Sequence, residues 1–157
     1  MIDRNLSVRT AIYQKLAGQL ALDGKEVPVY SKVAPTSGAV RTYVYVPTQF
    51  NTDASVKTGF SEDQTVRVEA VHRPDSYTDA TGIDLLAAQI KGLLAVEFAV
   101  ELGDVPGLID WRFKEDRDLQ DVDGVEVIYR RVLTFEAKFD ACYTEYKRRP
   151  HGRQRRR

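Results

Sequence analysis

The stretch DVDGVEVIYRRVLTFEAKF, residues 121–139, has the alternation of a β-strand entered through a tight turn, with two adjacent arginines in its middle. Neighbouring residues of a strand point to opposite faces, so Arg130 and Arg131 must lie on different sides. The far half of the strand places apolar side chains on one face, namely Leu133, Phe135, Ala137 and Phe139. The sequence therefore predicts a strand whose second half has a core face and whose first half is charged on both faces.

A partner strand precedes this stretch. Residues 111–121 and 125–139 predict a hairpin joined through Val122-Asp123-Gly124, a three-residue loop with glycine in the left-handed position. This loop pairs residues whose numbers sum to 246, for example 111 with 135. Its pairs are Trp111 with Phe135, Phe113 with Leu133, Glu115 with Arg131, Asp116 with Arg130 and Arg117 with Tyr129. A two-residue Asp-Gly loop is the alternative; it sets Arg117 against Arg130, and like charges destabilise a cross-strand pair.

The half of this hairpin that lies nearer its loop is ionic. It carries six charged residues, Glu115, Asp116, Arg117, Asp118, Arg130 and Arg131. Ten residues per strand span about 33 Å, and an ionic ribbon of that length must project from its own domain. Exposed ion pairs contribute only about 0–1 kcal/mol each, so stability is a poor reason for so many. We therefore interpret these six residues as an inter-subunit docking arm; a solvated hairpin without a partner is the alternative.

The rest of the chain predicts two helices and several shorter strands. A first helix is indicated by apolar residues at helical spacing from Val8 to Leu20, with Ser7 as a cap and Gly24 as a stop. Residues 27–33 and 41–47 read as extended, with Pro28 and Pro47 at edges or strand ends.

Residues 50–63 are typical of a long polar loop, and residues 65–73 alternate as a strand. A second helix begins near Thr81 and is expected to run to about Glu101, before Gly103. Its apolar surface is broader than one stripe, which favours cover by a sheet and a neighbouring subunit, or a central place in its own domain.

Charge divides the chain into two parts. Residues 147–157 hold 7 of the 23 basic residues and no acid, which leaves 16 basic against 23 acidic residues in 1–146. We expect residues 1–146 to form one α+β domain and 147–157 a basic tail. The tail is either a solubilising end or a contact for polyanions through Lys147, Arg148, Arg149, Arg153, Arg155, Arg156 and Arg157.

A search for chemistry finds little. The chain has two histidines, His72 at a strand end and His151 in the tail, so a histidine-based triad or metal cluster is not expected. Single Cys142 excludes an internal disulfide and reads as a small packed residue. The DLQDVDG run at 118–124 lacks the ligands of a calcium loop, because Leu119 and Arg130 stand where oxygens are needed. We expect no enzyme activity, no cofactor, no metal and no membrane span.

Three segments carry a resemblance to a known family: AIYQKLAG in the first helix, TVRVEAVHR before GIDLLAAQIKGLLAV, and the closing IYRRVLTFEAKF. Over about residues 5–141 the chain resembles the tail terminator (tail completion) proteins of long-tailed bacteriophages and the related small minor tail proteins. The resemblance implies an α+β fold with a mixed or antiparallel sheet of about four to five strands, backed by two helices and ending in a long projecting hairpin. It brings no catalytic residues.

The same resemblance implies a function. Such proteins form a hexameric ring at the head-proximal end of the tail, where they cap the tail tube, stop its polymerisation and offer a surface to the head–tail connector. The implied partners are further copies of the chain, the tail tube protein and the connector, with DNA passing the lumen without specific binding, after assembly in the host cytoplasm. A head-completion subunit and a nucleic-acid-binding module using the arginine tail are the alternatives.

Overall fold

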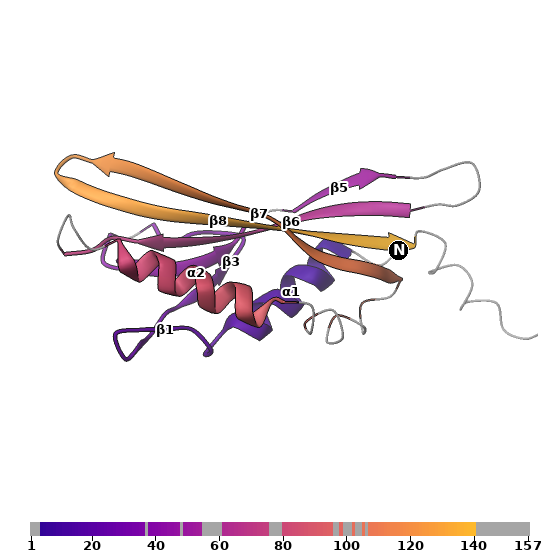
Figure 1. Cartoon of the computed structure of the whole chain (residues 1–157), viewed down its shortest axis with the longest axis horizontal. Coiled ribbons are helices and arrows are strands. Elements are labelled where there is room, and N and C mark those ends of the chain that lie inside the picture. The colour runs from indigo at the N-terminus through magenta and orange to yellow at the C-terminus, as the bar shows by residue number, and fades with distance from the viewer. Residues whose placement is uncertain are drawn as a thin grey trace, which may run out of the picture.

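A computed structural model of the chain shows two helices lying on one face of a six-stranded mixed sheet (Figure 1). The structure describes residues 4–36, 38–47, 49–54, 61–75, 80–95, 98, 102, 105 and 107–140. The helices are α1 (Arg4–Leu16) and α2 (Thr81–Leu93). The α+β fold expected from the sequence is thereby confirmed.

The sheet is built around two long central strands. Its strands are β3 (Val29–Ser31), β4 (Thr42–Val46), β5 (Phe50–Asp53), β6 (Ser61–His72), β7 (Leu108–Asp123) and β8 (Glu126–Asp140). The order is β3-β4-β6-β8-β7, with β5 on the half of β6 that β4 does not cover. Strand β3 runs parallel to β4, and the other pairs are antiparallel. A separate two-stranded ribbon follows α1, formed by β1 (Ala21–Leu22) and β2 (Lys25–Glu26).

The sixth strand is a correction to the predicted four or five. Residues 50–63 were expected to be a polar loop, yet Phe50–Asp53 pairs with the first residues of β6. Asn51 and Thr52 are exposed there, so the segment lacks the apolar alternation that marks a half-buried strand. Residues 55–60 lie outside the described residues.

The core lies between the helices and one face of the sheet. On β8 the predicted core residues Leu133, Phe135, Ala137 and Phe139 are all buried, and Val66 and Val68 of β6 lie beside them. The helices contribute Val8, Ile12, Leu16, Ile83, Leu86 and Ile90. Each such side chain removed from water contributes about 1.5–3 kcal/mol to folding. The core face predicted for the second half of β8 is therefore confirmed.

Both helices have boundaries that differ from the prediction. Helix α1 begins at Arg4, so Ser7 lies inside it, and it ends at Leu16; Gly24 instead has a φ of 74° in the turn between β1 and β2. Arg4 joins the helix to the sheet, because it donates to Glu62 (2.9 Å) and to the carbonyl of Asp140 (2.8 Å).

Helix α2 ends at Leu93 rather than near Glu101. The carbonyl of the next residue, Leu94, accepts a hydrogen bond of 3.0 Å from the Trp111 indole of β7. A tertiary partner thus serves one of the carbonyls that a helix leaves free at its C-terminal end.

The register of the hairpin is also a correction. The loop is Gly124-Val125, with Asp123 opposite Glu126, and Gly124 has the positive φ (64°) that a type II′ turn requires at its first position. Neither predicted loop is right, and Trp111 lies opposite Ala137. Trp111 and Phe135 are diagonal neighbours, whose rings stack with centroids 5.1 Å apart.

Two β-bulges explain why no single register fits. The pairing shifts between Leu108 and Asp110 and again between Phe113 and Glu115, so Ile109 and Lys114 are extra residues on β7. Each extra residue moves the side chains that follow it on β7 to the opposite face of the sheet. Because of the bulge at Lys114, Asp116 lies opposite Leu133, on the same face as the helices.

The hairpin projects less than the sequence indicated. Strand β8 lies between β6 and β7, and β6 pairs with it from Asp140 to Tyr129, so Arg130 and Arg131 are inside the sheet. Only Glu126–Ile128 of β8 and their partners on β7 extend beyond β6. In Figure 1 this part is the free end of the ribbon formed by β7 and β8. The two arginines need not project, because each has a carboxylate partner on its own face of the sheet.

Candidate subunit-docking surface

Asp116 and Arg131 form an ionic cluster against α2. Arg131 donates to both carboxylate oxygens of Asp116, at 2.6 and 3.0 Å, and also to Asp84 of α2. Lys91, about two turns further along the same face of α2, also donates to Asp116. The Asp116 and Arg131 side chains keep only 14% and 21% of their surface exposed. This cluster binds the hairpin to its own domain, so these two residues are less available to another subunit than the docking-arm prediction requires.

The charges in this cluster shift each other's ionisation. The Arg131 guanidinium, by hydrogen bonding to the carboxylate, holds the pKa of Asp116 below its usual value, and Lys91 acts in the same direction. The same hydrogen bond raises the pKa of Arg131. The ionised pair is therefore the stable form near neutral pH.

Arg130 lies on the opposite face of the sheet. It is 3.2 Å from Asp121 and 3.7 Å from Glu69, beside a small apolar cluster of Tyr43, Val71 and Ile128. Glu69 also accepts a hydrogen bond of 2.8 Å from Tyr45. Burial, together with that hydrogen bond, raises the pKa of Tyr45 to about 12. This side of the sheet thus has its own packed polar network.

The other three predicted docking residues face solvent on β7. Glu115 and Arg117 are two residues apart on one face and pair with each other at 2.8 Å. Asp118 is exposed on the helix side, opposite Arg131. No described strand pairs with the outer edge of β7. The six predicted residues are therefore split between an internal cluster, an outer-face network and an exposed edge.

The tip of the hairpin is a feature that sequence reasoning missed. Val122 and Val125 are 68% and 79% exposed, and Leu119 is partly exposed nearby. The surrounding residues are acidic: Asp118, Asp121, Asp123 and Glu126 fall within 118–126, which contains no base. We call residues 118–126 the tip. Valine in a tight loop, where polar residues are usual, was the available signal.

An aromatic pocket lies where β7 passes the end of α2. Its volume is about 250 Å³, and the described residues that line it are Lys91, Leu94, Ala95, Trp111, Arg112, Phe113 and Phe135. Leu94, Trp111 and Phe135 are buried, whereas Phe113 is 47% exposed. The two charged residues, Lys91 and Arg112, are both basic. Sequence reasoning missed this pocket, because it depends on where α2 meets β7.

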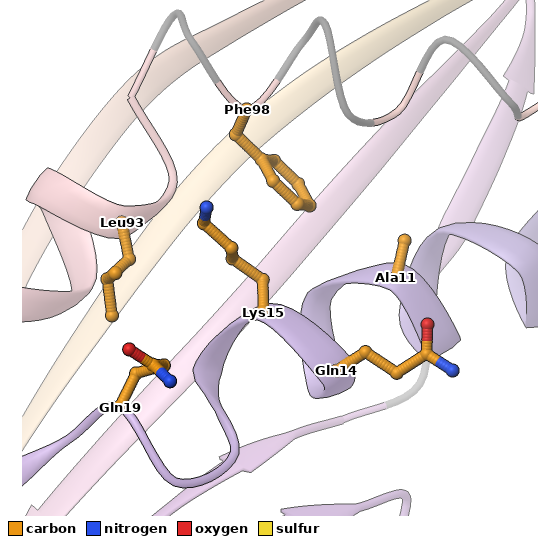
Figure 2. Close-up of a pocket in the computed structure, with 6 residues that line it drawn as sticks. All are labelled: Ala11, Gln14, Lys15, Gln19, Leu93 and Phe98. Atoms are coloured by element: carbon orange, nitrogen blue, oxygen red, sulfur yellow. The ribbon is translucent and has the colours of Figure 1, made fainter.

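A larger hollow of about 420 Å³ lies between the two helices (Figure 2). Ala11, Gln14 and Lys15 of α1 line it together with Gln19, Leu93 and Phe98. Figure 2 shows the Lys15 side chain extending from α1 toward the space beside Leu93 and Phe98. Its described lining offers one base and two amides, without a carboxylate or a nucleophile.

Among the described residues no three His, Cys, Asp or Glu side chains are grouped so that they could hold a metal ion. None of the described helices has the length and apolar character needed to cross a membrane. His72 is buried in the described part, where its Nδ1 lies 2.8 Å from the Thr42 hydroxyl. Cys142, His151 and the whole basic tail, 147–157, lie outside the described residues.

Comparisons with known proteins bear on the fold. No protein-family model matches the chain, and no curated protein matches it. A chain from the solved virion of a native gene transfer agent particle is similar over 89% of this chain and 99% of that chain, with a TM-score of 0.53 and 22% identity. The likeness at this identity establishes a shared fold.

Proposed function

We propose that the chain is a structural protein of a bacteriophage-like virion and acts there as a tail terminator. In this role several copies, six in the family that the chain resembles, form a closed ring at the head-proximal end of the tail. The ring caps the tail tube, ends its growth and meets the head connector. The observation that carries the proposal is the fold shared with a virion chain over nearly the full length of both.

The surface of the domain supports an assembly role. Its tip extends beyond β6 and presents two exposed valines, and the edge of β7 carries charged side chains. Charge patterns of this kind set the orientation of partners and exclude wrong ones. Residues 1–146 also carry a net charge of −7, from 16 basic and 23 acidic residues, which suits a lumen that DNA must pass without being held.

Loss of the gene tests the proposal directly. In a phage that encodes this chain, deletion should give tails of uncontrolled length that remain unjoined to heads, as seen by electron microscopy. The wild-type gene supplied from a plasmid should restore normal length. Tails of normal length that fail to join heads would instead assign the chain to the head connector, and normal joined particles would remove the virion role.

A further inference from the structure

The tip of the hairpin has the properties of a ligand for a small apolar site. Val122 and Val125 together place two exposed branched side chains at the end of a stiff two-stranded ribbon. Four carboxylates lie within residues 118–126: Asp121 pairs with Arg130 at 3.2 Å and Glu126 with Arg41 at 3.3 Å, whereas Asp118 and Asp123 are exposed. Two exposed branched side chains at one end of a ribbon offer a small apolar surface that a partner can cover.

The aromatic pocket has the matching properties. Phe113 stands half exposed at its mouth, with its ring edge against Phe135 at 5.6 Å, and Trp111 is buried beneath. Its volume of about 250 Å³ is below the range of about 300–1,000 Å³ that small-molecule sites occupy and suits a side chain. Lys91 at its rim is opposite in charge to the tip, whereas the Arg112 side chain turns to the other face of the sheet, where it binds Glu136.

The chain cannot place its own tip in its own pocket. Phe113 and Val122 are nine residues apart on the single strand β7, which corresponds to about 30 Å at ~3.3 Å per residue. Figure 1 shows the ribbon of β7 and β8 extended over this length without folding back. The occupant must therefore come from another molecule.

We propose that the tip of one copy inserts into the aromatic pocket of the next. Val122 and Val125 then contact Phe113 and Ala95, while the exposed carboxylates of the tip, Asp118 and Asp123, face Lys91. The two surfaces lie on different parts of the chain, so the contact is heterologous, and repetition around an axis closes a ring. This inference rests on the proposed ring and names the contact that builds it.

The ion pairs already present do not remove the complementarity. Lys91 donates to Asp116, so the rim charge is held in place. The Lys91 side chain nevertheless keeps 38% of its surface exposed. The contact should weaken as salt is added, because charges at the rim of an interface are screened.

Two variants of the full-length chain test the contact. The tip variant carries Val122→Lys and Val125→Lys, which replaces the apolar side chains with charges that repel the rim. The pocket variant carries Ala95→Glu, which fills the mouth with an acid that repels the tip. All three positions are exposed, so the unfolding temperature should stay that of the wild type. Val33→Lys, at a position also exposed (67%), is the matched control.

Sedimentation velocity measures the result. The wild type and the Val33→Lys control should form the ring, and each variant alone should associate at least about tenfold more weakly. An equimolar mixture of the two variants should form dimers and no larger species, because the intact tip of one fits the intact pocket of the other. Only a heterologous contact predicts this outcome.

Three outcomes would overturn the inference: variants that assemble like the wild type, a mixture without dimers, or a wild type that is monomeric at its highest soluble concentration. None of these alone decides the tail-terminator role, which the tail lengths in the gene deletion test independently. Rings formed by both variants, together with overlong tails in the deletion, would keep the function and reject this contact.

Discussion

Gly82 lies in the first turn of α2, against His72 at the end of β6. A Cβ atom at this position would stand 2.8 Å from Nε2 of His72 and 3.1 Å from a methyl carbon of Leu22. The imidazole has little freedom to withdraw, because it is buried and its other nitrogen is 2.8 Å from the Thr42 hydroxyl. The absence of a side chain at Gly82 thus sets how closely the helix packs on the sheet.

We predict that Gly82→Ala destabilises the fold by about 1–3 kcal/mol, the usual cost of overpacking a filled core. Gly92, in the last turn of the same helix, has open space around its Cβ position. Gly92→Ala should therefore stabilise the chain, by up to about 1 kcal/mol, through helix propensity. Urea unfolding of both variants measures the difference. Equal effects at the two glycines would contradict the close approach at Gly82.

At the scale of elements, the alternation of side chains within a strand predicted the buried face correctly, whereas the predicted pairing between strands was wrong. The core face of β8 follows from apolar side chains two residues apart, which is a local property of the sequence. The prediction of that face is confirmed. The register was wrong because bulges at Ile109 and Lys114 change the pairing partway along β7, and nothing local in IDWRFKE marks them. The aromatic pocket was missed for the same kind of reason, since it needs the tertiary contact between Trp111 and Leu94.

The ionised side chain of Asp116 links β7 to α2 and β8. The pKa of Asp116 is lowered in the folded chain, chiefly by hydrogen bonding from Arg131. This carboxylate therefore stabilises the fold at pH values above 3.8, its ordinary pKa. The contribution is lost as the pH falls through the lower, folded pKa. We predict that Asp116→Asn costs about 1–3 kcal/mol near neutral pH.

The pH dependence separates this effect from a general loss of packing. The difference between wild type and Asp116→Asn should shrink as the pH falls below about 4, where the unfolded carboxyl binds a proton. Urea unfolding at a series of pH values gives the curve. Asp118→Asn removes a neighbouring exposed charge and should leave stability nearly unchanged. A constant difference across the whole pH range would contradict the ionic role of Asp116.

At the scale of the whole molecule, charge separates residues 1–146, which are acidic on balance, from residues 147–157, which are basic. The described domain accounts for the fold and for the proposed ring contact without residues 147–157. Seven bases without an acid give that segment a sequence-independent attraction to polyanions. We therefore assign it no part in ring formation and place it, as a hypothesis, outside the lumen or against the partner on the capsid side.

Deletion of residues 147–157 tests this separation. The shortened chain should form rings of unchanged stoichiometry by sedimentation, and any binding of the full chain to duplex DNA should fall steeply with salt and disappear with the tail. Head–tail joining that is unchanged by the deletion would remove the capsid-side role. Loss of the rings themselves would show that the tail belongs to the assembly contact.

The bulges on β7 have a consequence for chains that have not yet assembled. A long strand with an open edge is a template on which other chains can stack into fibres, and interruptions of the hydrogen-bonding pattern are one means of preventing this. Ile109 and Lys114 interrupt the first half of that edge, and charged side chains line the uninterrupted second half, from Glu115 to Asp123. Unassembled copies should therefore resist stacking edge to edge, as the proposed role at the end of a finished tail requires.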